Sequence, residues 1–410
     1  MSSKDKKTEL LAPAGNFEKL EIAIHYGADA VYLGGRDFSL RNFSGNFTLD
    51  ELKSAVKLAH NHGVKIYVAC NVYSRNHEQK AITDYLEQLG KIRPDALIVS
   101  DPGIIREACR AIPEIPLHLS TQANTTSYRI ALFWEDIGIR RINTARELSL
   151  KEIREIAEQS SVEIETFVHG AMCISYSGRC LLSSFMANRD SNRGLCSHPC
   201  RWKYSVVEEQ RPGIYYPLAE DERGSYIFNS KDLCMVSHIP EMVGAGITSL
   251  KIEGRMKGIH YVASAVKVYR EAIDTYYACP EKYTVKKEWI ESLAKINNRG
   301  YCTGFYFGDP EQVIPNYDKS LYSPVAHVFL GKVIETGPDS VKIDVRNKMF
   351  KGEEIEVLPG KGLVKTDKIN DIFNEVGESL PFAQPNTIVT VLLATECSPN
   401  DLIRRVIIND

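Results

Sequence analysis

Long apolar runs are missing from this 410-residue sequence, and none is long enough to cross a bilayer as a helix. The N-terminal MSSKDKKTE is polar and is not followed by the apolar segment of a secretory signal. Neither charge sign dominates: 50 Lys and Arg stand against 53 Asp and Glu, and the formal net charge is −3. The overall charge therefore favours neither nucleic acid nor membrane. We expect a cytoplasmic protein with no membrane partner, in which cysteines stay reduced.

Low-complexity tracts and tandem repeats are also missing. Instead, short apolar runs alternate with amphipathic segments such as FEKLEIAIHYG and LKEIREIAEQS. Eight apolar runs are rich in β-branched or aromatic residues: TELLAPAG, DAVYLGG, VKIYVACN, DALIVSD, PLHLSTQAN, IRRINTAR, VEIETFVHG and ITSLKIEG. Eight strands, most followed by a helix, predict a (β/α)8 TIM-like barrel. A doubly wound open sheet is the alternative, because connectivity alone does not show closure.

The barrel is expected over residues 1–278, and one of its connections is unusually long. About 60 residues separate the seventh run from the next predicted helix, DLCMVSHIPEMVGAG, and loops of this length are usually functional or disordered. This insertion after strand 7 (170–231) would lie on the C-terminal face, where barrel active sites sit. A helical and irregular linker is expected over 279–324. Period-2 alternation over 325–410 then predicts a small C-terminal β-barrel.

Four of the ten cysteines lie in the inserted segment, with the spacing C-x6-C-x15-C-x3-C. They are Cys173, Cys180, Cys196 and Cys200. Thiolates suit both zinc and iron–sulfur clusters. The wide first gap favours a cluster, because structural zinc ligands usually come in closely spaced pairs. Four buried free thiols are the structural alternative.

The arginines of the inserted segment and the other six cysteines have alternative interpretations. Four arginines interleave with the cysteines and would offset the charge of a cluster, unless the loop is simply solvated: Arg179, Arg189, Arg193 and Arg201. Cys234 is a fifth ligand candidate, but its place in a predicted helix favours packing. We also expect packing roles for the remaining cysteines: Cys70, Cys109, Cys279, Cys302 and Cys397.

The segment ETFVHGAMCISYSGRCLLSSF resembles the signature of the collagenase-like peptidase family U32. The resemblance extends over most of the chain through LLAPAGN, NRGLCSHPCRWKY, NSKDLC, SLKIEGR and NNRGYCTGFYFG. Size and the C-terminal module are most similar to the branch of that family that modifies tRNA. That resemblance implies hydroxylation of the wobble uridine to 5-hydroxyuridine, with a 4Fe-4S cluster and with prephenate as co-substrate. It places the cluster ligands at Cys173, Cys180, Cys196 and Cys200.

The same resemblance implies tRNA and prephenate as partners, and it leaves open an oligomer with a second copy or with a related family member. Two other functions are the alternatives: a peptidase, and a non-catalytic cluster-bearing binding protein. The sequence has neither a G-x-S-x-G elbow nor an H-E-x-x-H motif. A peptidase would need a Cys–His pair such as Cys173 and His169, and Cys173 cannot both ligate a cluster and act as nucleophile.

Polar residues end most of the predicted barrel strands, where barrel active sites lie. They include Asn71, Asp101, Ser120, Gln122, Asn124, Arg146, Glu165, His169, Glu253 and Arg255. We predict catalytic roles for Glu165, His169, Glu253 and Arg255, and substrate-binding roles for Arg41, Asn71, Gln122, Asn124 and Arg179. Strand alternation points Glu165 and Glu253 inward. Arg255 is the first choice for a prephenate carboxylate, since guanidinium groups bind carboxylates bidentately.

The C-terminal module has many lysines but few aromatic residues, and acidic residues interleave with the lysines. RNA-binding β-barrels combine basic residues with exposed aromatic rings. The module is therefore interpreted either as a surface that positions tRNA or as a structural cap beside the barrel.

Overall fold

The computed structural model describes residues 7–40, 45–172, 176–201, 231–308 and 327–406. It also describes four two-residue strands: β8 (Val206–Val207), β9 (Tyr215–Tyr216), β10 (Glu220–Asp221) and β11 (Gly224–Ser225). Within these ranges no helix combines the length and apolar character needed to cross a membrane.

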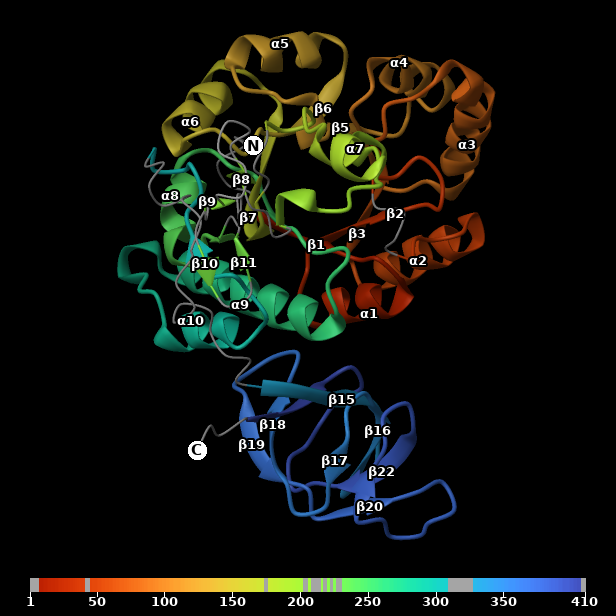
Figure 1. Cartoon of the computed structure of the whole chain (residues 1–410), viewed down its shortest axis with the longest axis vertical. Coiled ribbons are helices and arrows are strands. Elements are labelled where there is room, and N and C mark those ends of the chain that lie inside the picture. Colours follow the sequence, from red (N-terminus) through yellow and green to blue (C-terminus); the bar gives the residue numbers. More distant parts are fainter. Residues whose placement is uncertain are drawn as a thin grey trace.

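Eight parallel strands close into a barrel, as predicted (Figure 1). They are β1 (Glu9–Pro13), β2 (Ala30–Gly34), β3 (Lys65–Cys70), β4 (Ala96–Val99), β5 (Leu117–Leu119), β6 (Ile139–Asn143), β7 (Glu163–Ala171) and β13 (Ser249–Ile252). β1 pairs with β2 on one side and with β13 on the other, and β13 also pairs with β7. This last pairing closes the ring and excludes the doubly wound alternative.

Helices surround the barrel, and buried apolar side chains pack between them and the strands. They are α1 (Phe17–His25), α2 (Leu49–Asn61), α3 (Gln79–Ile92), α4 (Pro102–Ala111), α5 (Tyr128–Asp136), α6 (Leu150–Gln159), α8 (Ile239–Gly244), α9 (Ile259–Ala278) and α10 (Lys287–Ala294). Thr48 and Ser149 form capping boxes that start α2 and α6. Asp101, one of the polar residues at the strand ends, caps α4 by accepting a 3.0 Å hydrogen bond from the Ile104 N–H.

The region after the inserted segment differs from the prediction. Only α8 of the predicted helix DLCMVSHIPEMVGAG is α-helical, and Asp232–Cys234 forms a strand, β12. β7 extends to Ala171, and the end of this strand pairs antiparallel with β12. β14 (Tyr301–Cys302), from the predicted linker, pairs with the other edge of β12. Cys234 therefore lies in a strand, so the helical placement was wrong.

The scattered cysteines only partly follow the expected packing roles. Cys70 and Cys302 are buried, and burial raises the pKa of the Cys70 thiol to about 12. Cys397 packs against the core of the C-terminal domain. Cys109 and Cys279 are exposed, and for these two the prediction was wrong.

The C-terminal residues form a separate antiparallel β-domain below the barrel in Figure 1, as expected. Its strands are β15 (His327–Thr336), β16 (Ser340–Val345), β17 (Met349–Phe350), β18 (Glu354–Leu358), β19 (Lys365–Lys368), β20 (Asp371–Phe373), β21 (Phe382–Ala383), β22 (Ile388–Leu392) and β23 (Leu402–Val406). The domain rests on the barrel helices. The Tyr26 hydroxyl donates to the Leu358 carbonyl at 2.6 Å, and Arg346 pairs with Glu18 at 2.6 Å.

Candidate active site at the barrel mouth

A polar pocket with a cavity volume of about 60 Å³ opens to solvent at the C-terminal ends of the barrel strands. Its lining residues come from most of the strands: Tyr32, Leu40, Ala69, Asn71, Ile98, Ser120, Thr121, Gln122, Asn143, Arg146, Phe167, Lys251, Glu253 and Arg255. Three of these side chains are cations and one is a carboxylate. The pocket therefore suits a small anionic ligand with hydrogen-bonding groups.

Arg146 and Glu253 are held near one another over an aromatic ring. The Arg146 guanidinium lies 4.1 Å from the centre of the Phe167 ring and donates to the Ala171 carbonyl at 3.1 Å. Its second terminal nitrogen is 3.9 Å from a Glu253 oxygen. The planar guanidinium is thus oriented by stacking, which prepares it for a bidentate contact.

Lys251 lies at the inner end of the pocket and is almost fully buried. Its Nζ donates to Glu165 at 2.6 Å and lies 4.5 Å from the centre of the Tyr32 ring. Asn143 also lines the pocket, and its Oδ1 is buried without a partner among the described residues. A pocket lined by a buried cation and a buried acceptor can bind a ligand that carries both an anionic and a hydroxyl group.

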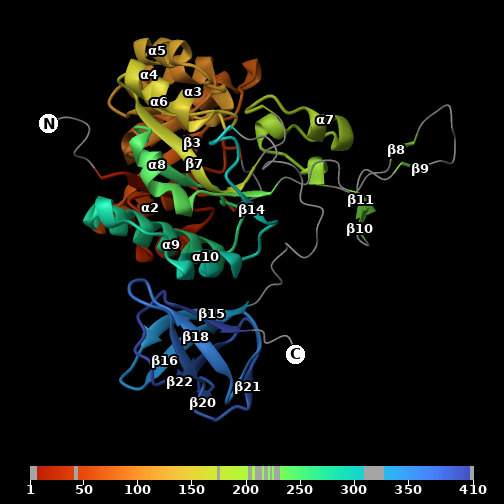
Figure 2. The same ribbon diagram turned by 90° about the vertical axis from the view of Figure 1, so that its left-hand side faces the viewer.

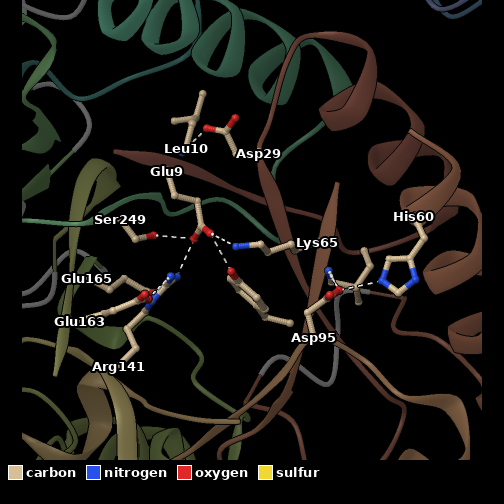
Figure 3. A network of polar contacts seen from close by, with 12 residues as sticks. Glu9, Leu10, Asp29, His60, Lys65, Asp95, Arg141, Glu163, Glu165 and Ser249 are labelled. Atoms are coloured by element: carbon tan, nitrogen blue, oxygen red, sulfur yellow. Dashed lines mark hydrogen bonds and ion pairs between the residues drawn. The ribbon is translucent and has the colours of Figure 1, made fainter. Parts of the chain in front are cut away.

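At the N-terminal ends of the barrel strands, an ionic network surrounds Glu9 and Arg141 (Figure 3). Arg141 donates to Glu9 and to Glu163, each at 2.5 Å, and lies 3.6 Å from the second oxygen of Glu165. Glu9 also accepts from the Tyr67 hydroxyl at 2.7 Å. Burial alone would raise the pKa of Glu9, but Arg141 outweighs it and the pKa is lowered. The buried Glu9 carboxylate is therefore held in its ionised form by its pairing with Arg141.

Four of the predicted site residues meet in the pocket: Asn71, Gln122, Glu253 and Arg255. Asn71 accepts from the Leu40 N–H and donates to Ser120, which fixes its amide. Arg255 donates to Ser39 at 2.8 Å and to Asn46. Its two terminal nitrogens are thus engaged by the loop after β2, whereas Arg146 faces a carboxylate inside the pocket.

Glu165 and His169 lie outside the pocket although both are on β7. Glu165 points into the barrel, as alternation predicts, but below the pocket. A register shift between β7 and β13 at this level then reverses the alternation. His169 therefore packs outside the barrel against three tyrosine rings, Tyr261, Tyr269 and Tyr301. Burial lowers the pKa of His169 to about 4, so the ring is neutral at neutral pH.

The remaining predicted binding residues do not line the pocket or lie outside the described residues. Asn124 ends a short 3₁₀ turn in the left-handed conformation and does not line the pocket. Arg179 is exposed on the inserted segment and does not line the pocket. Arg41 and Cys173 lie outside the described residues.

The described part of the inserted segment, 176–201, is seated on loops at the barrel mouth. Arg193 donates to the Tyr73 carbonyl at 2.6 Å and to Glu78 at 2.5 Å. The Ser177 N–H donates to Glu147 at 2.7 Å. The backbone at Gly178, with φ of +73°, is so close to Gln122 that a Cβ there would lie 2.1 Å from the Gln122 carbonyl oxygen. The segment is thus fixed beside the pocket.

Cys180, Cys196 and Cys200 all belong to this segment, and none of the three forms a disulfide within the described residues. Cys180 precedes α7 (Leu182–Ala187), and Cys200 lies in the 3₁₀ turn Pro199–Arg201. Their donor chemistry fits a thiolate-ligated cluster. Over the ranges that the structure describes, however, no three His, Cys, Asp or Glu side chains are gathered as a ligand set for a metal ion.

Sequence reasoning missed Lys251 and Asn143, and it noted Arg146 without assigning it a role. A lysine in the middle of the apolar run ITSLKIEG was an available signal, because a charged residue in a barrel strand must be paired or functional. Whether such a residue reaches the pocket depends on the shear of the barrel, which no local pattern reveals.

The barrel is closed, charged side chains line the pocket at its mouth, and a segment with three cysteines lies beside that pocket. These features define the class of barrel proteins that bind a small polar ligand at the C-terminal ends of their strands. The chain belongs to peptidase family U32: the model of that family matches residues 15–314, and the model of its C-terminal domain matches 326–404.

Three relatives show which proteins it resembles. Over 407 residues it is 42% identical to tRNA hydroxylation protein P1 of Bacillus subtilis, covering 98% of this chain and 95% of that protein. It is 37% identical to tRNA hydroxylation protein P of Escherichia coli, covering 97% and 95%. A 23S rRNA 5-hydroxycytidine synthase of Escherichia coli is 31% identical, over 87% of this chain and 53% of that protein.

Proposed function

We propose that this protein is an RNA-modifying enzyme that hydroxylates the wobble uridine of tRNA to 5-hydroxyuridine, with prephenate as co-substrate and a 4Fe-4S cluster. The observation that carries the proposal is similarity over nearly the full length to two tRNA hydroxylation proteins. The pocket and the cysteine segment add chemistry that suits such a reaction. A cluster would supply redox or Lewis-acid chemistry at the mouth of the pocket, held by Cys173, Cys180, Cys196 and Cys200.

The pocket suits prephenate, which carries two carboxylates and a hydroxyl group. Arg146 and Lys251 can each bind one carboxylate, and Arg255 stays a third candidate. Asn143 Oδ1 and Gln122 Oε1 are buried acceptors without partners among the described residues, and either can accept from the hydroxyl group. Glu253, opposite Arg146, would repel a misplaced carboxylate and so favour one orientation of the ligand.

Peptidase chemistry has less support from the geometry. The candidate base His169 is buried among tyrosines outside the barrel and does not line the pocket. A general base must lie within hydrogen-bond reach of its nucleophile. None of the three described cysteines of the inserted segment forms a hydrogen bond with His169.

The function is tested by nucleoside mass spectrometry of tRNA. We expect this protein to restore 5-hydroxyuridine in a strain from which the tRNA-hydroxylating proteins have been deleted. Restoration should fail when the strain is also unable to make prephenate. No 5-hydroxyuridine after expression of the intact, cluster-loaded protein would refute the function. Restoration without prephenate would refute the co-substrate only.

Arg146→Gln is expected to weaken prephenate binding by about 10-fold or more, because a charge-assisted hydrogen bond contributes roughly 1.5–3 kcal/mol. Isothermal titration of the purified protein measures the effect. Arg106→Gln, which removes an exposed arginine from α4, serves as the matched control and should leave the affinity unchanged. Equal affinities of Arg146→Gln and the wild type would place the carboxylate elsewhere.

A further inference from the structure

The inserted segment exposes an unusual number of large apolar side chains. Within eleven residues, Tyr176, Leu181, Phe185 and Met186 are 65%, 56%, 82% and 47% exposed. The value for Phe185 is the highest of any large apolar side chain in the described part of the chain. Scattered apolar residues on a surface are ordinary, but a concentration of them marks a surface that binds something.

This exposure is not the result of a loosely attached loop. Arg193 and Ser177 tie the segment to the barrel loops at Glu78 and Glu147. Figure 2 shows α7 standing clear of the barrel on the side where the segment leaves it. The aromatic side chains are therefore presented on a fixed support next to Gln122, which lines the pocket.

The charge around these side chains points to an anionic partner. Residues 176–201 contain four arginines and a single acidic residue, Asp190. Arg179 is exposed and lies three residues from Tyr176. Exposed aromatic rings interleaved with arginines are the composition that stacks unpaired bases and contacts the phosphates between them. A protein partner for an apolar surface would not require this excess of positive charge.

We propose that Phe185 and Tyr176, with Arg179, form a stacking surface for unpaired bases of the tRNA loop that carries the target uridine. A base must leave its stack before an enzyme can act on it, and an adjacent aromatic surface offsets the cost of unstacking its neighbours. The inference rests on the proposed function and adds the part of the molecule that holds the loop.

The test compares binding of a hairpin RNA, with a uridine-containing unpaired loop, to binding of a fully paired duplex of equal length. Fluorescence anisotropy is measured on the full-length protein at two salt concentrations. Phe185→Ala should weaken hairpin binding about 10-fold, the effect of losing one stacked base, and leave duplex binding nearly unchanged. Phe185→Trp should retain the affinity. Phe133→Ala, which removes a 56% exposed phenylalanine from α5, is the control and should have no effect.

The salt dependence separates stacking from phosphate contact. Phe185→Ala should leave the slope of log affinity against log salt unchanged, whereas Arg179→Gln should reduce it. The proposal is overturned if Phe185→Ala binds the hairpin as tightly as the wild type does, or if it loses equal affinity for the hairpin and the duplex. It is also overturned if Phe185→Ala converts an oligomer of the protein to a monomer. If the wild type and Phe185→Ala restore 5-hydroxyuridine equally well at limiting expression, the stacking surface is refuted while the function stands. Failure of the wild type to restore it refutes the function itself.

Discussion

Arg141→Met is expected to lower the free energy of unfolding of the barrel by about 3–5 kcal/mol, because removing one partner of a buried ion network leaves uncompensated charge. Arg141 is 3% exposed and contacts Glu9, Glu163 and Glu165. Urea denaturation followed by tryptophan fluorescence reports on the barrel region, since all three tryptophans (Trp134, Trp202 and Trp289) precede the C-terminal domain.

Arg140→Met is the matched control, because Arg140 is the preceding residue of β6 and is exposed. It should change stability by less than about 0.5 kcal/mol. Adding Glu9→Gln to Arg141→Met should recover part of the loss, since the buried carboxylate is then neutral. A loss below about 1 kcal/mol for Arg141→Met would mean that water or a shifted lysine compensates Glu9, and the network would not be a stabilising feature.

Cys180→Ala is expected to abolish or sharply reduce cluster occupancy, because a cluster that has lost one of four thiolates is poorly held. Iron and sulfide analysis of anaerobically purified protein, with its absorption spectrum, measures this without reference to activity. Cys173→Ala, Cys196→Ala and Cys200→Ala should behave in the same way. Cys279→Ala and Cys109→Ala replace exposed cysteines outside the segment and should keep full occupancy.

The same series decides the fourth ligand. Cys234 lies on β12, which pairs with β7 at the rim of the barrel. If Cys234→Ala loses the cluster while Cys200→Ala retains it, Cys234 replaces Cys200 in the ligand set. A colourless, iron-free wild type with intact thiols would remove the cluster from the proposal altogether.

Much of the fold was readable from local patterns. Each of the eight predicted apolar runs corresponds to one barrel strand, because a buried parallel strand needs a nearly continuous apolar run between turn residues. Short strands were harder to predict from the sequence. β12 and β14 exist only because β7 extends beyond the rim and offers an edge, and a two- or three-residue strand leaves no periodicity to detect.

Part of the candidate site could also be predicted from the sequence, because the position of a residue at the end of a strand is a local property. Because the C-terminal ends of barrel strands converge, the sequence could place Asn71, Gln122, Glu253 and Arg255 at one mouth, and the structure brings them together there. It could not foresee the register shift that turns His169 away, nor that Arg255 is engaged by Ser39 and Asn46.

The sequence by itself determined the barrel, the separate β-domain and the crowding of cysteines in one insertion, because hydrophobic period and residue spacing are local properties. Only the tertiary structure decided which charges meet. Arg146 follows β6, whereas Lys251 and Glu253 lie at the end of β13, and Glu9 is joined to Arg141 across 132 positions of the chain. Such pairs depend on the closure and shear of the barrel, since these set which inward side chains share a layer.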